Sequence, residues 1–281
     1  MTASHNVSII IPHFKRIDEL KRLLISLKTI TEPNEIIIIE SKNPAKARNE
    51  GVTRAKGEFI WFLDSDSEIQ DPEVLNRMVE ILKDDSIAGV GGELVEVNGM
   101  WHALVPFHFP NWFSFSRYFN KPFEVYPRCI ATNNLLIRKK DFIGFDEDLK
   151  TMEDNDLCLR MKGKFIARQD TCVLHHHSLT ERKVGKFAFY NDTKNYINTI
   201  HQTRVEILYR NRRHLLWILP LLDIIFAPPT LLYQMLSNIN SNILLAEKSG
   251  NKIGLLWFII LHIKSMVSSW KKGYELLVNS N

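Results

Sequence analysis

Residues 57–66 read Gly-Glu-Phe-Ile-Trp-Phe-Leu-Asp-Ser-Asp, a short apolar run that ends in two carboxylates. The run Phe59–Leu63 has the length and the bulky side chains of one strand, and the polar residues after it indicate a turn. A continuous apolar run of this kind is typical of a strand that is buried on both faces. The stretch therefore predicts a central strand with Asp64 at its carboxyl end.

The segments around this run alternate between strand and helix patterns. Short apolar runs predict strands, and apolar residues at helical spacing predict helices, in the order strand 7–11, helix 18–28, strand 36–39, helix 45–55, strand 59–63, helix 71–82, strand 87–97 and strand 130–137. This alternation predicts an α/β fold, a Rossmann-like and mostly parallel sheet flanked by helices. Ligands bind beyond the carboxyl ends of such strands, where Pro12, Glu40 and Asp64 are expected.

The charge of the chain is unevenly distributed. The 281 residues carry a net charge of +4, but residues 181–281 hold 13 basic and 6 acidic residues, a net of +7, which leaves −3 for residues 1–180. The basic residues are interleaved with long apolar runs, which favours an anionic membrane surface over nucleic acid as the partner. We therefore expect an α/β domain over residues 1–180 and a helical, basic and apolar region over 181–281.

The cysteines and the N-terminus indicate a reducing compartment. Cys129, Cys158 and Cys172 form no CxxC pair, which argues against a zinc site and against a disulfide framework. Residues 1–6 lack the charged start and the apolar stretch of about 7–15 residues that mark a signal peptide. We expect the protein on the cytoplasmic side.

Three polar clusters carry candidate chemistry. Asp64 and Asp66 flank a turn and could share one divalent cation, while residues 151–156 open a predicted helix with several acids. Residues 175–177 are three histidines that follow a short apolar run. Each cluster also has a simpler interpretation: a solvated turn, acids favoured by the helix dipole, and a polar strand end.

Together and in this order, the clusters resemble the family 2 inverting glycosyltransferases of the GT-A fold. The resemblance covers roughly residues 6–180 and is carried by the segments 7–12, 47–51, 55–66, 132–134, 137–138, 144–147 and 153–158. It implies transfer of a sugar from a nucleotide-diphosphate sugar donor in the presence of Mn²⁺ or Mg²⁺. A single displacement would then invert the configuration of the anomeric carbon.

The resemblance also implies roles for individual residues. Asp66 would be the direct metal ligand, with His175 as a second ligand and His176 as the alternative. Asp154 would be the catalytic base, with Glu153 beside it. The nucleotide-sugar contacts would be Pro12, Phe14, Glu40, Arg48, Asp64 and Ser65. In the family the second strand usually ends in an acidic pair and a serine, so Glu40, which precedes Ser41, is expected to replace the usual aspartate.

The acceptor is expected to be a saccharide or a lipid-linked saccharide, because a catalytic base helps a hydroxyl acceptor far more than a phosphate. A polyprenyl-phosphate sugar synthase is the first alternative. A sugar-phosphate nucleotidyltransferase normally has a glycine-rich loop after its first strand, and residues 11–16 contain no glycine. A binding subunit without catalytic activity is the remaining alternative, and the intact carboxylates argue against it.

Two further segments indicate how the chain could attach to a membrane. Residues 215–233 and 253–263 are apolar stretches edged by Lys, Arg and Trp, and the first contains Pro220, Asp223 and two further prolines. This pattern favours interfacial or re-entrant helices at the cytoplasmic face of the cell membrane, with a soluble helical cap and a single span as the alternatives. The aromatic-rich residues 98–128 are expected to form a loop that packs on the core or contacts the acceptor or the membrane.

Overall fold

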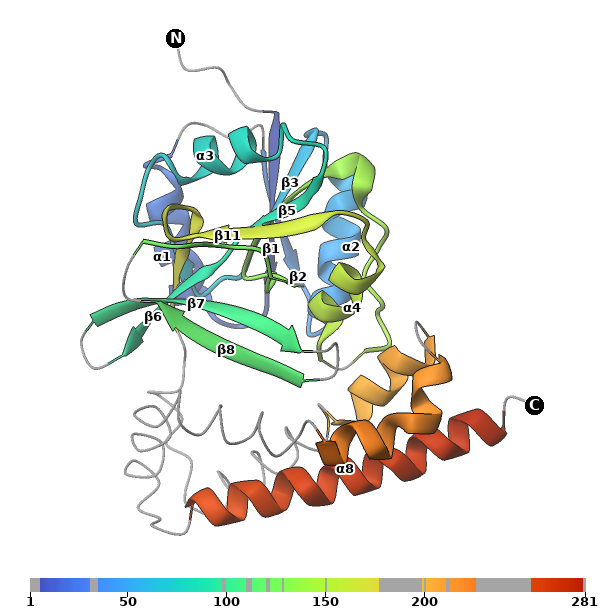
Figure 1. The fold of residues 1–281 in the computed structure, drawn as a ribbon. Coiled ribbons are helices and arrows are strands. Elements are labelled where there is room, and N and C mark those ends of the chain that lie inside the picture. The colour runs from blue at the N-terminus through green and yellow to red at the C-terminus, as the bar shows by residue number, and fades with distance from the viewer. Residues whose placement is uncertain are drawn as a thin grey trace. The chain divides into compact units, whose positions relative to one another are not determined.

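The computed structural model describes residues 6–30, 35–97, 100–109, 113–119, 122–127, 129–149, 151–176, 199, 201–210, 213–225 and 254–279. The chain forms two compact units (Figure 1). The α/β unit comprises Met1–His108, Ser116–Asp148 and Glu153–Ser178, and the helical unit comprises Phe109–Phe115, Leu149–Met152 and Leu179–Asn281.

The α/β unit is built on a seven-stranded sheet in the order β2-β1-β3-β10-β5-β11-β9. Its strands are β1 (Val7–His13), β2 (Glu35–Glu40), β3 (Phe59–Leu63), β5 (Ile87–Gly91), β9 (Glu124–Val125), β10 (Asn134–Arg138) and β11 (Lys164–Arg168). β1 is parallel to β2 and β3, and β11 is parallel to β5, whereas β10 is antiparallel to both of its neighbours. The expected α/β sheet is confirmed, and it is mixed rather than mostly parallel.

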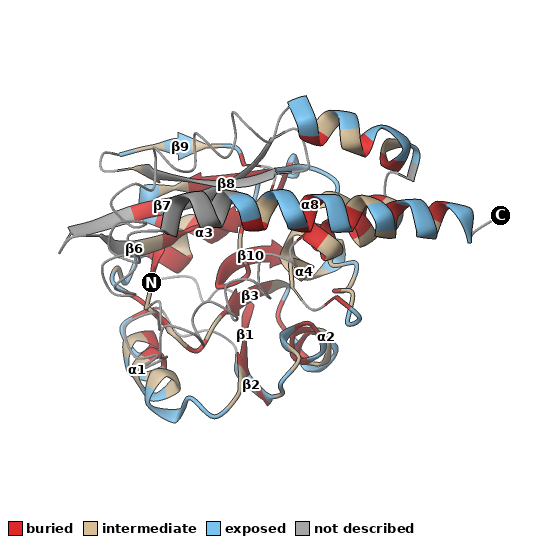
Figure 2. Ribbon diagram, turned by 90° about the horizontal axis from the view of Figure 1, so that it is seen from below, coloured by how far each residue is buried: buried red, intermediate tan, exposed pale blue. Residues whose placement is uncertain are grey.

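Helices cover both faces of this sheet (Figure 1). Helices α1 (Ile17–Leu27) and α3 (Val74–Ile81) lie on one face, and α2 (Pro44–Arg54) and α4 (Glu153–Arg160) lie on the other. Alternate strand residues supply the two cores: Ile9 and Trp61 pack with α1 and α3, while Ile10 and Phe62 pack with α2 and α4. Figure 2 shows the resulting pattern, in which the central strands are buried and α1 and α2 each keep an exposed side.

Local sequence explains where α2 begins and how closely it packs. The side chain of Asn43 accepts a hydrogen bond from the backbone N–H of Lys46 at 3.1 Å, and Pro44 occupies the first helical position. A Cβ atom at Gly51 would lie only 2.4 Å from Ile10 Cγ2, so glycine allows α2 to approach β1 closely. Helix α3 begins at Val74, later than the expected start near Asp71.

A five-stranded second sheet has the order β4-β12-β6-β7-β8. Its strands are β4 (Ser67–Glu68), β12 (Val173–His175), β6 (Glu93–Val97), β7 (Met100–Phe109) and β8 (Phe113–Phe119). The prediction of a loop over residues 98–128 is therefore wrong for β7 and β8. Gly92, with φ +131°, allows the chain to pass from β5 directly into β6.

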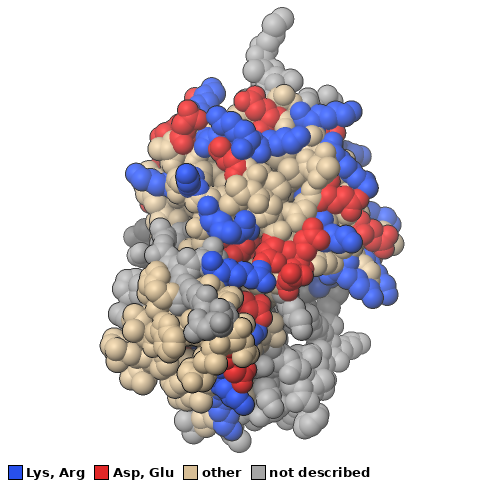
Figure 3. Space-filling view, turned by 90° about the vertical axis from the view of Figure 1, so that its right-hand side faces the viewer, with Lys and Arg blue, Asp and Glu red and all other residues tan. Residues whose placement is uncertain are grey.

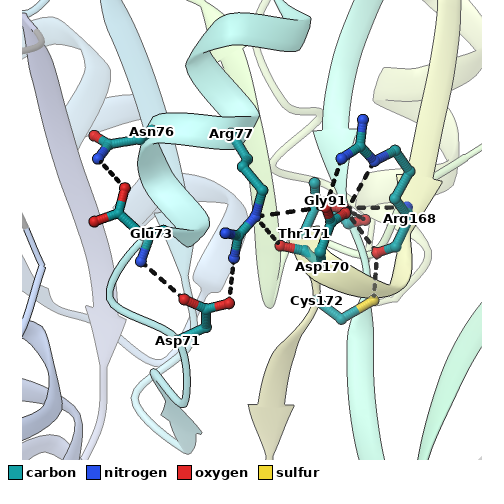
Figure 4. A network of polar contacts seen from close by, with 9 residues as sticks. All are labelled: Asp71, Glu73, Asn76, Arg77, Gly91, Arg168, Asp170, Thr171 and Cys172. Atoms are coloured by element: carbon teal, nitrogen blue, oxygen red, sulfur yellow. Dashed lines mark hydrogen bonds and ion pairs between the residues drawn. The ribbon is translucent and has the colours of Figure 1, made fainter. Parts of the chain in front are cut away.

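A polar network orients the start of β12 (Figure 4). Arg77 on α3 forms an ion pair with Asp71, and its Nε donates to the carbonyl oxygen of Asp170 at 3.0 Å. Asp170 belongs to the short helix η2 (Gln169–Thr171), and Thr171 Oγ1 donates to the carbonyl oxygen of Gly91 at 3.2 Å. These contacts hold η2 against α3 and β5, and β12 continues directly from η2. A similar short helix, η1 (Lys139–Asp141), follows β10.

The helical unit contains helical residues 201–210, the short helix η4 (Arg213–Ile218), helical residues 219–225 and the long helix α8 (Gly254–Val278). These segments share a small core formed by Val205, Leu208, Leu216, Leu219, Met266 and Leu277. Among the described residues, no helix has both the length and the apolar character that crossing a membrane requires. The part of the apolar stretch that follows residue 225 lies outside the described residues.

Candidate active site

The carboxyl ends of β1, β2 and β3 meet at one edge of the main sheet, as the sequence predicts. The strands pair in parallel, with Pro12 opposite Ile39 and with β3 on the other side of β1. Pro12, the exposed Glu40 and Asp64 therefore lie along the same edge. Figure 3 shows acidic side chains gathered in a band on the face of the molecule where α2 and α4 lie.

Arg48 connects two of the expected site residues. Its side chain is buried, with only 3% of its surface exposed, and it donates to Asp64 Oδ1 at 2.7 Å and to Glu153 Oε1 at 2.8 Å. Burial lowers the pKa of Arg48, but the two carboxylates outweigh this effect and raise it overall. The guanidinium also lies over the ring of Phe145, 5.6 Å from its centre. Arg48 was expected to contact the nucleotide sugar; the structure instead places it between two carboxylates, where it fixes the first turn of α4 relative to β3.

Glu153 and Asp154 are neighbours in sequence but differ in surroundings. Glu153 is paired with Arg48, whereas Asp154 Oδ1 accepts a hydrogen bond from the backbone N–H of Asn155 at 2.7 Å. Burial, together with the nearby charge of Glu153, raises the pKa of Asp154 to about 7. A carboxylate with a pKa close to the ambient pH is suited to accept a proton. Of the two acids, Asp154 is thus the better candidate for the base.

A second group of charged residues lies where the turn after β3 meets β12. β12 pairs with β4 in an antiparallel register that sets His175 opposite Ser67, one residue after Asp66. His175 Nε2 is 3.2 Å from Asp66 Oδ1, and the opposite ring nitrogen, Nδ1, is 2.7 Å from Glu93 Oε2. Because a carboxylate accepts hydrogen bonds and cannot donate them, Nδ1 carries a hydrogen and donates to Glu93.

The charges in this group stabilise one another. Burial lowers the pKa of His175, but the hydrogen bonds to Asp66 and Glu93 outweigh it and raise the pKa to about 10. Burial raises the pKa of Asp66, but His175 and the guanidinium of Arg16, 3.3 Å away, hold it below its ordinary value. The two carboxylates Asp66 and Glu93 thus face two cations, the protonated His175 and Arg16, so the group as a whole is close to neutral.

The geometry of Asp66 and His175 fits two ligands of one divalent cation. Two donor atoms bonded at about 2.1 Å and at a right angle to each other lie about 3 Å apart, close to the separation of Oδ1 and Nε2. A metal-bound histidine usually donates its other ring N–H to a carboxylate, and Glu93 occupies that position. Among the described residues, no group of three or more His, Cys, Asp or Glu side chains is arranged to hold a metal ion.

The structure distinguishes between the histidines of the triplet. His176 Nε2 lies 2.7 Å from Glu68 Oε2, and its backbone N–H donates to the carbonyl oxygen of Asp66 at 2.9 Å. His177 lies outside the described residues. The side chain that meets the Asp66 carboxylate is that of His175, which favours it over His176 as the ligand.

Basic and aromatic side chains lie near the carboxyl ends of β1 and β2. The half-buried ring of Phe14 has the ammonium groups of Lys15 and Lys42 at 5.3 and 5.6 Å from its centre. These lysines can attract a diphosphate, and the ring offers a flat apolar surface to a ribose or a base. Ser65, between the two aspartates of the turn, is buried.

Three residues of this site had no role in the sequence analysis. Glu93 is 7% exposed and Asn133 is 5% exposed, and the Asn133 amide donates to Glu93 Oε2 and lies 3.0 Å from His175 Nδ1. Arg16 reaches Asp66 from the loop after β1. The available signal for Glu93 was an acidic residue inside the predicted strand 87–97, where a buried charge needs a partner.

Comparisons with known proteins agree with this fold. Residues 40–142 match the model of the family described as Glycosyl transferase family 2. The mannosyltransferase PcManGT from Pyrobaculum calidifontis, solved with GDP-Man and Mn²⁺, shares the fold with a TM-score of 0.54 at 12% identity, over 95% of this chain and 88% of that chain. Residues 1–349 of TarS from S. aureus, solved with UDP-GlcNAc, give a TM-score of 0.45 at 18% identity, over 73% of this chain and 72% of that chain. No curated protein matches the chain.

The family match over residues 40–142 supports a glycosyltransferase, and the fold shared with PcManGT agrees with the expected α/β fold.

Proposed function

We propose that this glycosyltransferase transfers a sugar from a nucleoside-diphosphate donor to a hydroxyl group of a saccharide or lipid-linked saccharide, and that the donor binds with Mn²⁺ or Mg²⁺. The observation that carries the proposal is that two carboxylates have different surroundings, one suited to bind a cation and the other suited to accept a proton. Asp66 faces His175 in a pair suited to a cation, while Asp154, with its pKa near 7, is suited to accept a proton. Arg48 connects the turn that contains Asp66 with the helix that contains Asp154, because it binds Asp64 and Glu153.

On the donor side, the residues of the chain compensate the charge of the diphosphate and position it. A divalent cation, when bound by Asp66 and His175, would neutralise negative charge on the leaving diphosphate. Lys15 and Lys42 add positive charge at the same edge of the sheet. Asp64, held by Arg48, is placed to accept hydrogen bonds from the ribose or from water. The similar fold of PcManGT, solved with GDP-Man and Mn²⁺, contains a donor and a metal of these classes.

On the acceptor side, Asp154 receives the proton. As the acceptor oxygen forms its bond to the anomeric carbon, the bond between that carbon and the diphosphate oxygen breaks. The hydroxyl proton moves to the Asp154 carboxylate, a contribution of about 10²–10⁴-fold for a well-placed base. Attack from the face opposite the diphosphate inverts the anomeric configuration.

The polyprenyl-phosphate sugar synthase is the second candidate, and the surroundings of Asp154 argue against it. A phosphate acceptor is already ionised at neutral pH and needs no base. A buried carboxylate with a raised pKa would then lower stability without serving the reaction. A sugar-phosphate nucleotidyltransferase is disfavoured by the loop after β1, residues 14–16, which contains no glycine.

Thermal-shift measurements with UDP- and GDP-sugars test the donor proposal. A ligand that binds only the folded state raises stability by about 2.7 kcal/mol at a hundred times its Kd. We expect one donor to raise the Tm in the presence of Mn²⁺, and we expect EDTA or Asp66→Asn to abolish the rise. A rise of equal size in wild type with and without EDTA would contradict a metal-dependent donor site.

A further inference from the structure

The helical unit buries an ion pair beside its small apolar core. Arg204 and Asp223 are 4% and 0% exposed, respectively, and form a paired contact in which Nη1 and Nη2 donate to Oδ1 and Oδ2 at 3.0 and 2.8 Å. Trp270 on α8 donates its indole N–H to Asp223 Oδ2 at 2.6 Å. This network ties residues 201–210, residues 219–225 and α8 together, and it determines which side of each helix faces inward.

The side of α8 that faces inward is a continuous stripe. Leu261, Ser265, Ser269 and Leu277 are all buried and follow one another at intervals of four or eight residues. Met266 adds to the same face and packs in the small core of the unit. The opposite side of α8 is therefore free to face the surroundings, and Figure 2 shows exposed turns along its length.

The outward sides of two helical segments are apolar. In residues 217–225, Trp217, Leu221 and Ile224 are 63%, 57% and 62% exposed, at intervals of four and three residues that place them on one face. On α8, a second exposed stripe consists of Ile260, Ile263, Val267, Tyr274 and Val278. A small soluble unit gains nothing from exposing so many large apolar side chains, and such surfaces mark interaction sites.

Basic residues border the stripe on α8. Lys264 and Lys271 are exposed and lie on the side of the helix next to Ile260 and Val267. Lysine is depleted at the centre of protein–protein interfaces, whereas apolar faces edged by lysine and tryptophan are typical of helices that lie in the plane of a membrane. Each lysine near an anionic surface contributes about 1 kcal/mol of attraction. The charge and the apolar stripe thus favour the same occupant, an anionic lipid surface.

We propose that the helical unit binds the surface of an anionic lipid bilayer through the two stripes, with Trp217, Leu221 and Ile224 on one and Ile260, Ile263 and Val267 on the other. The apolar side chains enter the boundary between headgroups and acyl chains, and Lys264 and Lys271 contact the headgroups. The buried Arg204–Asp223 pair keeps the two stripes outward. The stripes share no residue with the donor site, so we expect their loss to leave donor binding unchanged.

Vesicle flotation with the full chain tests this proposal. We expect the wild type to float with vesicles that contain phosphatidylglycerol, and to float less with phosphatidylcholine alone. The double variant Leu221→Glu/Ile224→Glu should weaken binding at least about tenfold, because burial of two large apolar side chains is lost. Lys264→Glu/Lys271→Glu should weaken binding to the anionic vesicles and remove the difference between the two lipids.

Ile25→Glu is the matched control, because Ile25 on α1 is 65% exposed but belongs to the α/β unit. It should float as the wild type does. Lipids with brominated acyl chains should quench tryptophan fluorescence, and part of this quenching should be lost in Trp217→Phe. A wild-type chain that ignores both vesicles overturns the proposal. The proposal is also overturned if Leu221→Glu/Ile224→Glu converts a dimer into a monomer but leaves vesicle binding unchanged, because the stripes would then bind a second copy of the chain.

Discussion

The two units differ in where their main charged groups and their exposed apolar stripes lie. In the α/β unit, apolar strands fill the interior and the charged groups Asp66, His175 and Asp154 lie at the edge of the sheet. In the helical unit, the ion pair Arg204–Asp223 is inside, and large apolar residues such as Ile224 are outside. The first arrangement suits a soluble fold with a reactive edge. The second suits a unit whose surroundings are partly apolar.

Two buried histidines show the same contrast. Burial lowers the pKa of His201 in the helical unit to about 2, and the charge of Arg204 adds to this effect. The pKa of His175, which is also buried, is raised to about 10 because Asp66 and Glu93 face it. Burial acts in the same direction on both rings, so the neighbouring charges decide the outcome. The carboxylates beside His175 favour its protonated form, whereas burial beside Arg204 favours the neutral form of His201.

The largest expected effect comes from making the same substitution in each unit. Asp66→Asn removes a carboxylate from the donor side and should lower transfer by roughly three orders of magnitude while weakening metal-dependent donor binding. Asp223→Asn leaves Arg204 buried without its charge partner and should cost about 3–5 kcal/mol of stability. Its transfer rate to a water-soluble acceptor should change little while it stays folded.

Urea unfolding and initial rates at saturating donor separate these outcomes. The comparison of the units fails if folded Asp223→Asn loses donor binding, or if Asp66→Asn is destabilised but fully active.

The next effect is a pH dependence set by Asp154. Only the ionised carboxylate accepts a proton, so kcat/KM should fall about tenfold per pH unit below the pKa of about 7 and level off above it. Between pH 7 and pH 5 the loss should be about fiftyfold, and Asp154→Asn should lack this slope. A wild-type profile that is flat over this range would contradict the assignment of the base.

A smaller effect is expected for the carboxylate behind His175. Glu93 accepts a hydrogen bond from His175 Nδ1 and so directs Nε2 toward Asp66. Metal-bound histidines usually have such a carboxylate partner, and its loss typically lowers metal affinity about 10–100-fold. Glu93→Ala should weaken Mn²⁺ binding within this range, and Glu93→Gln, which still accepts the hydrogen bond, should weaken it less. Calorimetric titration with Mn²⁺ alone measures both.

Glu68→Gln is the matched control for this measurement. Glu68 contacts His176 at the same 2.7 Å distance, but His176 is not the ring that meets the Asp66 carboxylate. We expect its Mn²⁺ affinity to stay close to that of the wild type. Equal losses for Glu68→Gln and Glu93→Gln would remove the distinction between the two histidines.

The last expected effect concerns how the free energy of unfolding depends on pH. The pKa of Asp154 rises from its ordinary 3.8 to about 7 on folding, so the folded state binds the proton more tightly and stability is lost as pH rises through this window. At pH 8 Asp154→Asn should therefore be more stable than the wild type, by at most about 4 kcal/mol, which corresponds to a Tm higher by up to roughly 10 °C. At pH 4 the difference should nearly vanish. A variant less stable than the wild type at pH 8 would indicate a structural role for the carboxylate.

Much of the α/β unit could be predicted from local sequence, because each element carries its own pattern. The alternating environments of Ile9, Ile10 and Ile11 follow from a strand buried on both faces, and Asp64 falls at the strand end as expected. The direction of β10 could not be predicted, since a strand's own residues do not encode which way it enters the sheet. β6 and β7 are adjacent in the chain, but β7 and β8 were missed because they belong to a second sheet that β12, far along the chain, helps to form.

The site divides in the same way. Asp66, Asp154 and His175 were found because they stand in recognisable motifs. Glu93 and the bridging role of Arg48 depend on contacts between residues 82 and 105 positions apart, which no local pattern contains. The choice of His175 over His176 likewise required the register of β12 against β4.

The most direct test of the account measures two quantities on Asp154→Asn: the single-turnover rate of sugar transfer and the Kd of the donor with Mn²⁺. The central claim is that the α/β unit binds the donor at Asp66 and His175 and accepts the proton at Asp154. The account predicts a rate about 10²–10⁴-fold below wild type with a donor Kd changed by less than about threefold. A nearly normal rate, or a donor affinity that falls together with the rate, would contradict it.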